Sequence, residues 1–119
     1  IPQYTSYVAR AQVSEALSLS SALKTAIAEY RQTAAVWPAD NATAGAPATI
    51  TGKYVATVAT TGAGLITVTM GAAAPVSTDL QSKTLTLQAT DGDGVISWVC
   101  DGAPAGTAIA DKFLPTSCK

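Results

Sequence analysis

The sequence offers few side chains that could carry out catalysis or bind a metal. It contains no histidine, and histidine is the commonest general base near neutral pH and the commonest metal ligand. Neither a Ser-His-Asp triad nor a Cys-His pair can therefore be built. Cys100 and Cys118 would need two carboxylates to complete a zinc site, which is an unusual ligand set. We expect them to form one disulfide, which indicates an oxidising compartment.

The acidic residues also lack the spacing of a reactive or metal-binding group. Glu15 and Glu29 lie roughly on one face of a predicted helix, but the helical rise separates them by about 21 Å, too far for paired carboxylate catalysis. We interpret both as solvated charges or contacts between subunits. The run Asp91-Gly92-Asp93-Gly94 lacks the further spaced ligands of a calcium loop and predicts a hairpin turn. We expect no enzymatic activity, no metal and no cofactor.

The triplet Asn41-Ala42-Thr43 matches the acceptor pattern for N-glycosylation. Position 39 is an alanine, so the acidic residue that bacterial N-glycosylation enzymes prefer is missing. We therefore expect Asn41 to be unmodified.

Length and charge describe a single domain with a weakly charged surface. A chain of 119 residues is long enough to bury a core as one domain. Only 13% of its residues are charged and the net charge is −1, so we expect no specific nucleic-acid partner. No apolar segment of 18 residues is present that could span a membrane.

Residues 3–34 predict one long helix, because no glycine or proline interrupts them. Apolar residues recur in steps of three and four and form a stripe, made of Ala16, Leu19, Leu23, Ile27 and Tyr30. The helix would be about 48 Å long, so one end should extend beyond so small a domain. Trp37-Pro38 ends it.

After a loop rich in small residues, the pattern changes to short alternating runs rich in β-branched residues. These runs predict strands at 53–59, 65–70, 84–89 and 95–100. Their short connections predict an antiparallel meander. The predicted fold class is α+β, with a long N-terminal helix packed on a four-stranded antiparallel sheet. Trp98 is expected in the core rather than as a platform for carbohydrate.

Both ends of the chain resemble type IVa pilins. The N-terminal stretches that carry the resemblance are Ile1-Pro2-Gln3-Tyr4, Tyr7-Val8-Ala9-Arg10 and Ser14-Glu15-Ala16-Leu17. At the other end, Trp98-Val99-Cys100 and Phe113-Leu114-Pro115-Thr116-Ser117-Cys118 look like the C-terminal disulfide region of Pseudomonas-type major pilins. The middle of the chain shows only a compatible pattern.

The resemblance implies a single pilin domain over 1–119. Its parts are a helix (1–34), a connecting loop (35–52), a sheet (53–100) and a C-terminal loop bounded by the disulfide (100–118). It implies a structural subunit of a type IV pilus that supports adhesion and twitching motility, located in the extracellular fimbrium. A full-length subunit would begin with a methylated, apolar segment that anchors it in the inner membrane before assembly and forms the filament core afterwards.

The resemblance also implies self-assembly, contact with the pilus assembly machinery and binding of host glycan receptors. The candidate filament contacts are Tyr4, Tyr7, Val8, Arg10 and Glu15. The candidate receptor-binding residues lie in the disulfide-bounded loop and are Asp101, Thr107, Asp111, Lys112, Phe113, Pro115, Thr116 and Ser117. Closing a loop of about 19 residues would also stabilise the fold by roughly 3 kcal/mol.

This loop departs from the best-known members of the family, because it is longer and its stretch 102–108 has no clear counterpart among them. Their receptor preference is therefore not carried over. The alternative function is that of a minor pilin or a type II secretion pseudopilin. The C-terminal disulfide favours the pilin, because many pseudopilins lack it and carry a calcium site.

Overall fold

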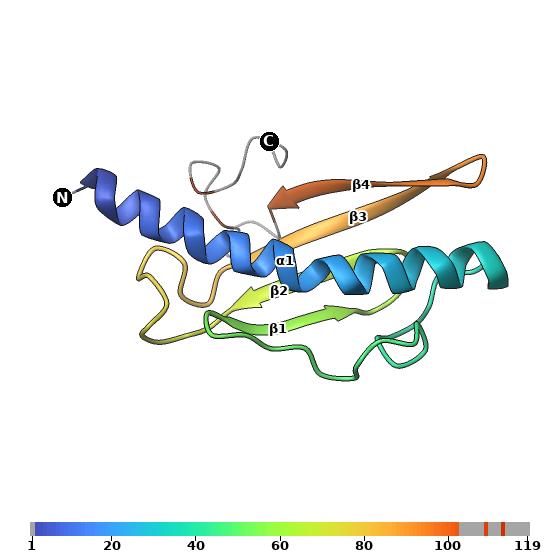
Figure 1. The fold of residues 1–119 in the computed structure, drawn as a ribbon, viewed down its shortest axis with the longest axis horizontal. Helices are drawn as coiled ribbons and strands as arrows, with labels where there is room; N and C mark the ends of the chain where they lie inside the picture. Colours follow the sequence, from blue (N-terminus) through green and yellow to red (C-terminus); the bar gives the residue numbers. More distant parts are fainter. Residues whose placement is uncertain (1, 103–108, 110–112, 114–119) are drawn as a thin grey trace.

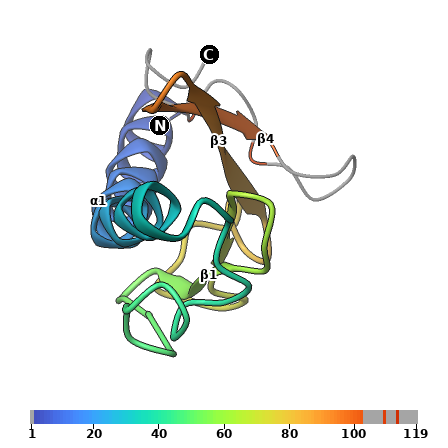
Figure 2. The ribbon, with the colours of Figure 1, turned by 90° about the vertical axis from the view of Figure 1, so that its right-hand side faces the viewer.

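The computed structural model describes residues 2–102, 109 and 113. One helix, α1 (Pro2–Ala34), precedes four strands: β1 (Val55–Thr60), β2 (Leu65–Met70), β3 (Thr84–Gly92) and β4 (Val95–Gly102). The strands form one sheet in the order β1-β2-β3-β4, and every neighbouring pair is antiparallel. The α1 helix runs across one face of this sheet (Figures 1 and 2). The predicted α+β class and the antiparallel meander are confirmed.

The helix has the predicted length because no helix-breaking residue interrupts it. It ends where Ala35 adopts a left-handed backbone conformation with a φ of 63°, a common way for a helix to terminate. The Arg31 guanidinium donates to the Ala35 carbonyl at 3.0 Å and satisfies an acceptor at this end. At the other end, the first turns extend past the strands (Figure 1).

The face of α1 that enters the core agrees with the predicted stripe at Ala16, Leu23 and Ile27 and continues toward the start of the helix. Leu19 and Tyr30 are only half-buried and flank this face. The fully buried apolar residues of the helix are Ala9, Val13, Ala16, Leu23 and Ile27. The polar residues Gln12 and Ser20 are also buried. Ser20 is accommodated because its hydroxyl donates to the Leu17 carbonyl at 2.8 Å.

The strand boundaries agree with the predicted ones to within a few residues. β1 starts later than predicted, and its register with β2 shifts between Val55 and Thr57. β3 and β4 are longer than predicted, because the pairing of β3 continues to the Gly92–Val95 pair at the hairpin and that of β4 continues past Cys100 to the Leu85–Gly102 pair. Asp93 and Gly94 form the turn with positive φ values of 53° and 86°, the combination that two-residue hairpins require. The predicted hairpin is confirmed.

Strand alternation places apolar side chains toward α1 and mostly threonines on the opposite face. Val58, Ile66, Val68, Leu85 and Leu87 are buried in one cluster with the core face of the helix. Ile109 and Phe113 join this cluster from the C-terminal region. The Ile109 amide donates to the Thr84 carbonyl at 3.0 Å, which fixes its place beside the start of β3.

Candidate functional site

The first half of α1 presents an exposed aromatic side chain. Tyr7 is 73% exposed, whereas Ala9 and Val13, which follow it on the helix, are completely buried. Arg10 is exposed and Val8 is half-buried, while the side chain of Tyr4 lies outside the described part of the chain. A large aromatic on an extending helix is typical of a surface that another molecule covers.

Glu15 acts within its own subunit. Its Oε1 accepts a hydrogen bond from the Tyr54 amide at 2.9 Å, and its side chain is half-buried rather than fully solvated. This differs from the interpretation of Glu15 as a solvated charge. The physical reason is that the loop before β1 brings an otherwise unpaired amide against the helix. Its proposed part in contacts between subunits stays a prediction.

Gln12 likewise forms hydrogen bonds with the backbone of the loop between β2 and β3. Its Oε1 accepts from the Ser77 amide at 2.8 Å, and its Nε2 donates to the Pro75 carbonyl at 3.2 Å. Together, Gln12 and Glu15 attach one helix to two loops at the same end of the sheet. This part of α1 is therefore fixed to the loops, while the first turns of the helix extend past the strands (Figure 1).

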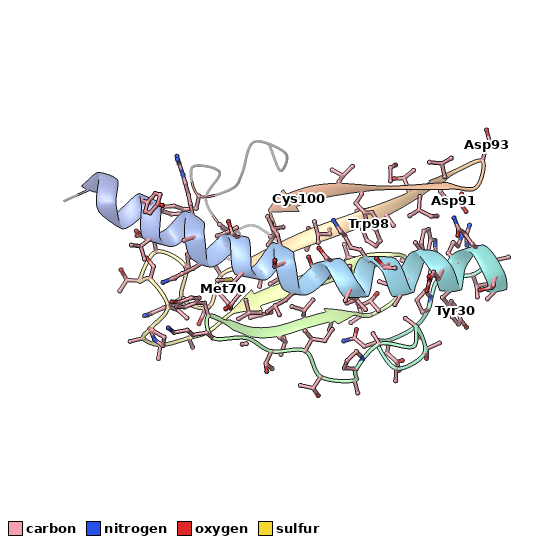
Figure 3. All side chains as sticks on the ribbon, viewed as in Figure 1. Tyr30, Met70, Asp91, Asp93, Trp98 and Cys100 are labelled. Atoms are coloured by element: carbon pink, nitrogen blue, oxygen red, sulfur yellow. The ribbon has the colours of Figure 1, made fainter. Side chains whose placement is uncertain are left out.

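The last turn of α1 is attached to the β3–β4 hairpin. Arg31 Nε donates to Asp91 Oδ2 at 3.0 Å, and the guanidinium lies 4.6 Å from the centroid of the Trp37 ring. Gln32 Nε2 donates to the Gly94 carbonyl at 3.3 Å. Figure 3 shows Asp91 and Asp93 at this hairpin end.

The same contacts engage the Asp91 carboxylate at the predicted hairpin turn. The hydrogen bond from Arg31, and then the one from the Gly94 amide, hold the pKa of Asp91 below its ordinary value of 3.8. The ionised carboxylate is thus already paired within the subunit. Among the described residues, no three histidine, cysteine, aspartate or glutamate side chains come close enough to hold a metal ion.

The glycosylation triplet in the loop after α1 has a structural use. Asn41 is only 3% exposed. Its Nδ2 donates to the Val58 carbonyl at 3.0 Å and its Oδ1 accepts from the Thr60 amide at 2.9 Å. The side-chain amide is therefore buried and fully engaged in the folded chain. Asp40 accepts from the Thr43 amide, which lowers the pKa of Asp40.

The C-terminal candidate residues divide into those that the structure describes and those that it does not. Cys100 is in a disulfide bond. Cys118 lies outside the described residues, so the pairing of Cys100 with Cys118 stays a prediction. Thr107, Asp111, Lys112, Pro115, Thr116 and Ser117 also lie outside the described residues.

Two of the predicted loop residues need correction. Asp101 belongs to β4 and pairs with Thr86, because the ladder continues past Cys100. Phe113 is 2% exposed and belongs to the hydrophobic core. The burial of a large apolar ring outweighs its display at the surface. Phe113 is therefore removed from the candidate receptor surface.

Sequence reasoning missed Gln12, Ser20 and the cluster of Arg31, Trp37 and Asp91. Extending the three- and four-residue steps backward from Leu23 would have predicted the buried position of Ser20. The partners of Gln12 and Arg31 lie 60 or more residues away in the sequence, so no local signal marks them. In the part of the chain that the structure describes, no helix combines the length and apolar character that crossing a bilayer requires.

Comparisons with known proteins give one consistent result. The sequence pattern of the pilin family, described as a bacterial filament family, matches residues 9–119. The fimbrial protein EcpC of Eikenella corrodens is 46% identical over 123 residues, which cover 100% of this chain and 76% of that protein. The type IV major pilin PilE of Neisseria gonorrhoeae is 37% identical, with 100% and 80% covered. A fimbrial protein of Neisseria meningitidis serogroup A is 35% identical, with 100% and 81% covered.

Proposed function

The chain belongs to the type IV pilin family and is a structural subunit of a pilus, and we propose that it polymerises through the first half of α1. The observation that carries this proposal is the 73% exposure of Tyr7 on a helix whose next turns are buried. Tyr4, Val8, Arg10 and Glu15 remain the other proposed contacts. The anchored part of the helix holds this surface in a fixed direction relative to the sheet.

The role that we propose is structural and involves no catalysis. Self-assembly into a filament and an extracellular location follow from the family. We further propose a stage in the inner membrane before assembly, contact with the pilus assembly machinery, and a part in twitching motility with force supplied by other proteins. The relatives named as major pilins favour a major subunit over a minor pilin or a pseudopilin. The Pseudomonas-like subtype stays a prediction.

Electron microscopy of filaments from the source cell, labelled with antibody to this chain, tests the proposal. We expect label along the whole length of each filament, because a major subunit repeats along it. Label confined to filament tips, or absent from filaments that carry other subunits, would contradict the proposed role. A strain without the gene provides the control for antibody specificity.

We propose that the C-terminal loop contributes to surface and host-cell adhesion. The disulfide at Cys100 supports this proposal, because a closed loop loses less conformational entropy on binding. The candidate side chains are Asp101, which lies at the end of β4, and the loop residues Thr107, Asp111, Lys112, Pro115, Thr116 and Ser117. Each site would bind a host glycan weakly, and many subunits on one filament would supply avidity.

Competition with a synthetic peptide tests the adhesive loop. An oxidised peptide that covers residues 100–118 should reduce the binding of filaments to epithelial cells, because it presents the same closed loop. The reduced and alkylated peptide is the matched control and should compete less. If the oxidised peptide does not compete, adhesion belongs to another surface or another subunit.

A further inference from the structure

A groove of about 370 Å³ runs between α1 and β4. Its lining comes from one flank of the helix and one strand residue, Trp98 (Figure 3). The lining residues are Ser21, Lys24, Thr25, Ala28, Glu29 and Trp98. This size falls within the range of small-molecule sites in proteins. The groove is separate from the extending turns of α1 and from the C-terminal loop.

Trp98 was expected in the core, but it packs against the core cluster only in part and also lines one side of the groove. Its backbone pairs with Ala89 of β3, and its side chain is half-buried. The indole N–H forms no hydrogen bond with the described residues, yet no side-chain nitrogen or oxygen among them is both buried and unpaired. The indole donor is therefore unpaired within the described residues but not fully buried.

Lys24 and Glu29 place one positive and one negative charge in the lining of the groove, and the two side chains do not form an ion pair with each other. They are five residues apart, so the helix rotates them about 140° away from one another. No acid stands three or four residues from Lys24, and no base stands three or four residues from Glu29, so neither has a partner at the spacings that allow helical ion pairs. Neither side chain forms an ion pair with another described residue.

Ser21 and Thr25 add acceptors without filling the groove. Their hydroxyls donate to the carbonyls of Leu17 and Ser21, at 3.3 and 3.2 Å. The hydroxyl hydrogens are thus used within the helix, while the oxygen lone pairs stay open to a ligand. Because these side chains and that of Ala28 are small, the space beside the indole remains empty.

We propose that this groove binds a neutral pyranose sugar. The C–H face of the ring would stack on the Trp98 indole. Lys24 and the indole N–H would donate to sugar oxygens, while Glu29 and the hydroxyl oxygens of Ser21 and Thr25 would accept from sugar hydroxyls. The lining carries one positive and one negative side chain, so it favours a neutral sugar over an anionic one.

Titration of the 119-residue chain with methyl β-D-galactopyranoside and with N-acetyl-D-glucosamine, followed by nitrogen-15 NMR, tests the proposal. We expect the Trp98 indole signal to shift with at least one of these sugars, with a Kd of about 1 mM. The Trp37 indole is the internal control, because the Arg31 guanidinium lies over its ring at the far end of the helix. The anionic sugar N-acetylneuraminic acid should bind more weakly than the neutral sugar.

Two leucine substitutions separate binding in the groove from general effects on the helix. Ala28→Leu should weaken binding at least about tenfold, because the larger side chain fills the space beside the indole. Ala22→Leu, on the exposed side of the same helix, should leave the affinity unchanged. Both substitutions keep a strong helix former, and thermal unfolding of each variant verifies that the fold is retained.

Several results would overturn the proposal. They are an unchanged Trp98 signal with both neutral sugars, equal shifts at Trp37, stronger binding of the anionic sugar, or full affinity in Ala28→Leu. The Trp98 signal could instead shift with protein concentration in the absence of sugar and stay unchanged when sugar is added. That result would show that a second copy of the chain occupies the groove. None of these results bears on filament assembly, so the two proposals fail independently.

Discussion

At the scale of single residues, amide and carboxylate side chains connect loops to the helix and the sheet, in addition to the apolar contacts that these loops make with the core. Asn41 is the clearest example, because one side chain bonds both the Val58 carbonyl and the Thr60 amide at the end of β1. We expect Asn41→Ala to lower the free energy of unfolding by about 1–3 kcal/mol, since it leaves two buried backbone groups unpaired. Chemical denaturation measures this change.

Thr61→Ala is the matched control for Asn41→Ala. Thr61 is exposed and follows the same strand, so its removal should change the free energy of unfolding by less than about 0.5 kcal/mol. Equal stabilities of the two variants would show that the Asn41 bonds contribute nothing. Mass spectrometry of the folded wild-type chain should also find no glycan on Asn41.

The carboxylate of Asp91 makes stability depend on pH in the acid range. Its pKa is lower in the folded chain than its ordinary value of 3.8, chiefly because Arg31 donates to it. The unfolded chain therefore binds more protons in this range, and stability rises with pH. The contribution of Asp91 is present above pH 3.8 and is lost as the pH falls through the lower folded value.

Asp91→Asn should therefore flatten the dependence of unfolding on pH below about pH 4, because it removes this titration. Asp93→Asn is the control, since Asp93 in the same turn forms no bond with the other described residues. Urea denaturation at a series of pH values measures both. A wild-type slope in Asp91→Asn would contradict the assignment, and the remaining slope should include the similarly lowered Asp40.

At the scale of elements, α1 is fixed at its middle and at its end by different side chains. Gln12→Leu should release the loop at residues 71–83, because the Ser77 amide and Pro75 carbonyl lose their partner. We expect faster hydrogen exchange at Ser77 and a lower Tm, with the β3–β4 hairpin unchanged. Gln32→Leu is the reciprocal control, since Gln32 bonds only the Gly94 carbonyl of that hairpin. Accelerated exchange throughout the sheet in Gln12→Leu would contradict a local role.

The elements could be predicted closely because their signals are local. An uninterrupted run of helix formers gives α1, and glycines with positive φ mark the turns. The predicted core positions Ala16, Leu23 and Ile27 are confirmed, whereas the small residues Ala9 and Ser20 were missed because packing against the sheet decides which small side chains are buried. Contacts such as Gln12–Ser77 join positions 65 residues apart.

The candidate site could be predicted only in part, because the burial of its side chains also depends on packing between distant segments of the chain. The exposure of Tyr7 agrees with its role as a predicted contact, because Tyr7 lies about 200° around the helix from the buried Ala9 and so faces away from the core. Phe113 shows the limit of such reasoning. Its place between the two cysteines suggested the surface, but the ring belongs to the core together with Ile109. Which apolar side chains of a loop turn inward depends on the space that the sheet and helix leave.

At the scale of the whole molecule, the shape suits assembly in one direction. The described residues measure 49 × 26 × 22 Å, and α1 runs along the longest dimension (Figure 1). The helix start and the β3–β4 hairpin lie at opposite ends (Figure 1), so a contact between these unlike ends would be heterologous. Heterologous contacts produce open helical filaments when their rotation does not close a ring. A surface at the helix start that is covered only in the filament fits this arrangement.

Tyr7→Ser in the natural full-length subunit tests that surface. We expect fewer and shorter filaments, because the substitution removes a large apolar contact area between subunits. The folding of the subunit should be unaffected, since Tyr7 is 73% exposed and buries little of its ring within its own chain. Val36→Ser is the matched control, because Val36 is 54% exposed just beyond the other end of α1. Counting filaments by electron microscopy at equal subunit levels, measured by immunoblot, separates assembly from expression. Wild-type filaments in Tyr7→Ser, or an equal loss in Val36→Ser, would show that the exposed start of α1 does not direct polymerisation.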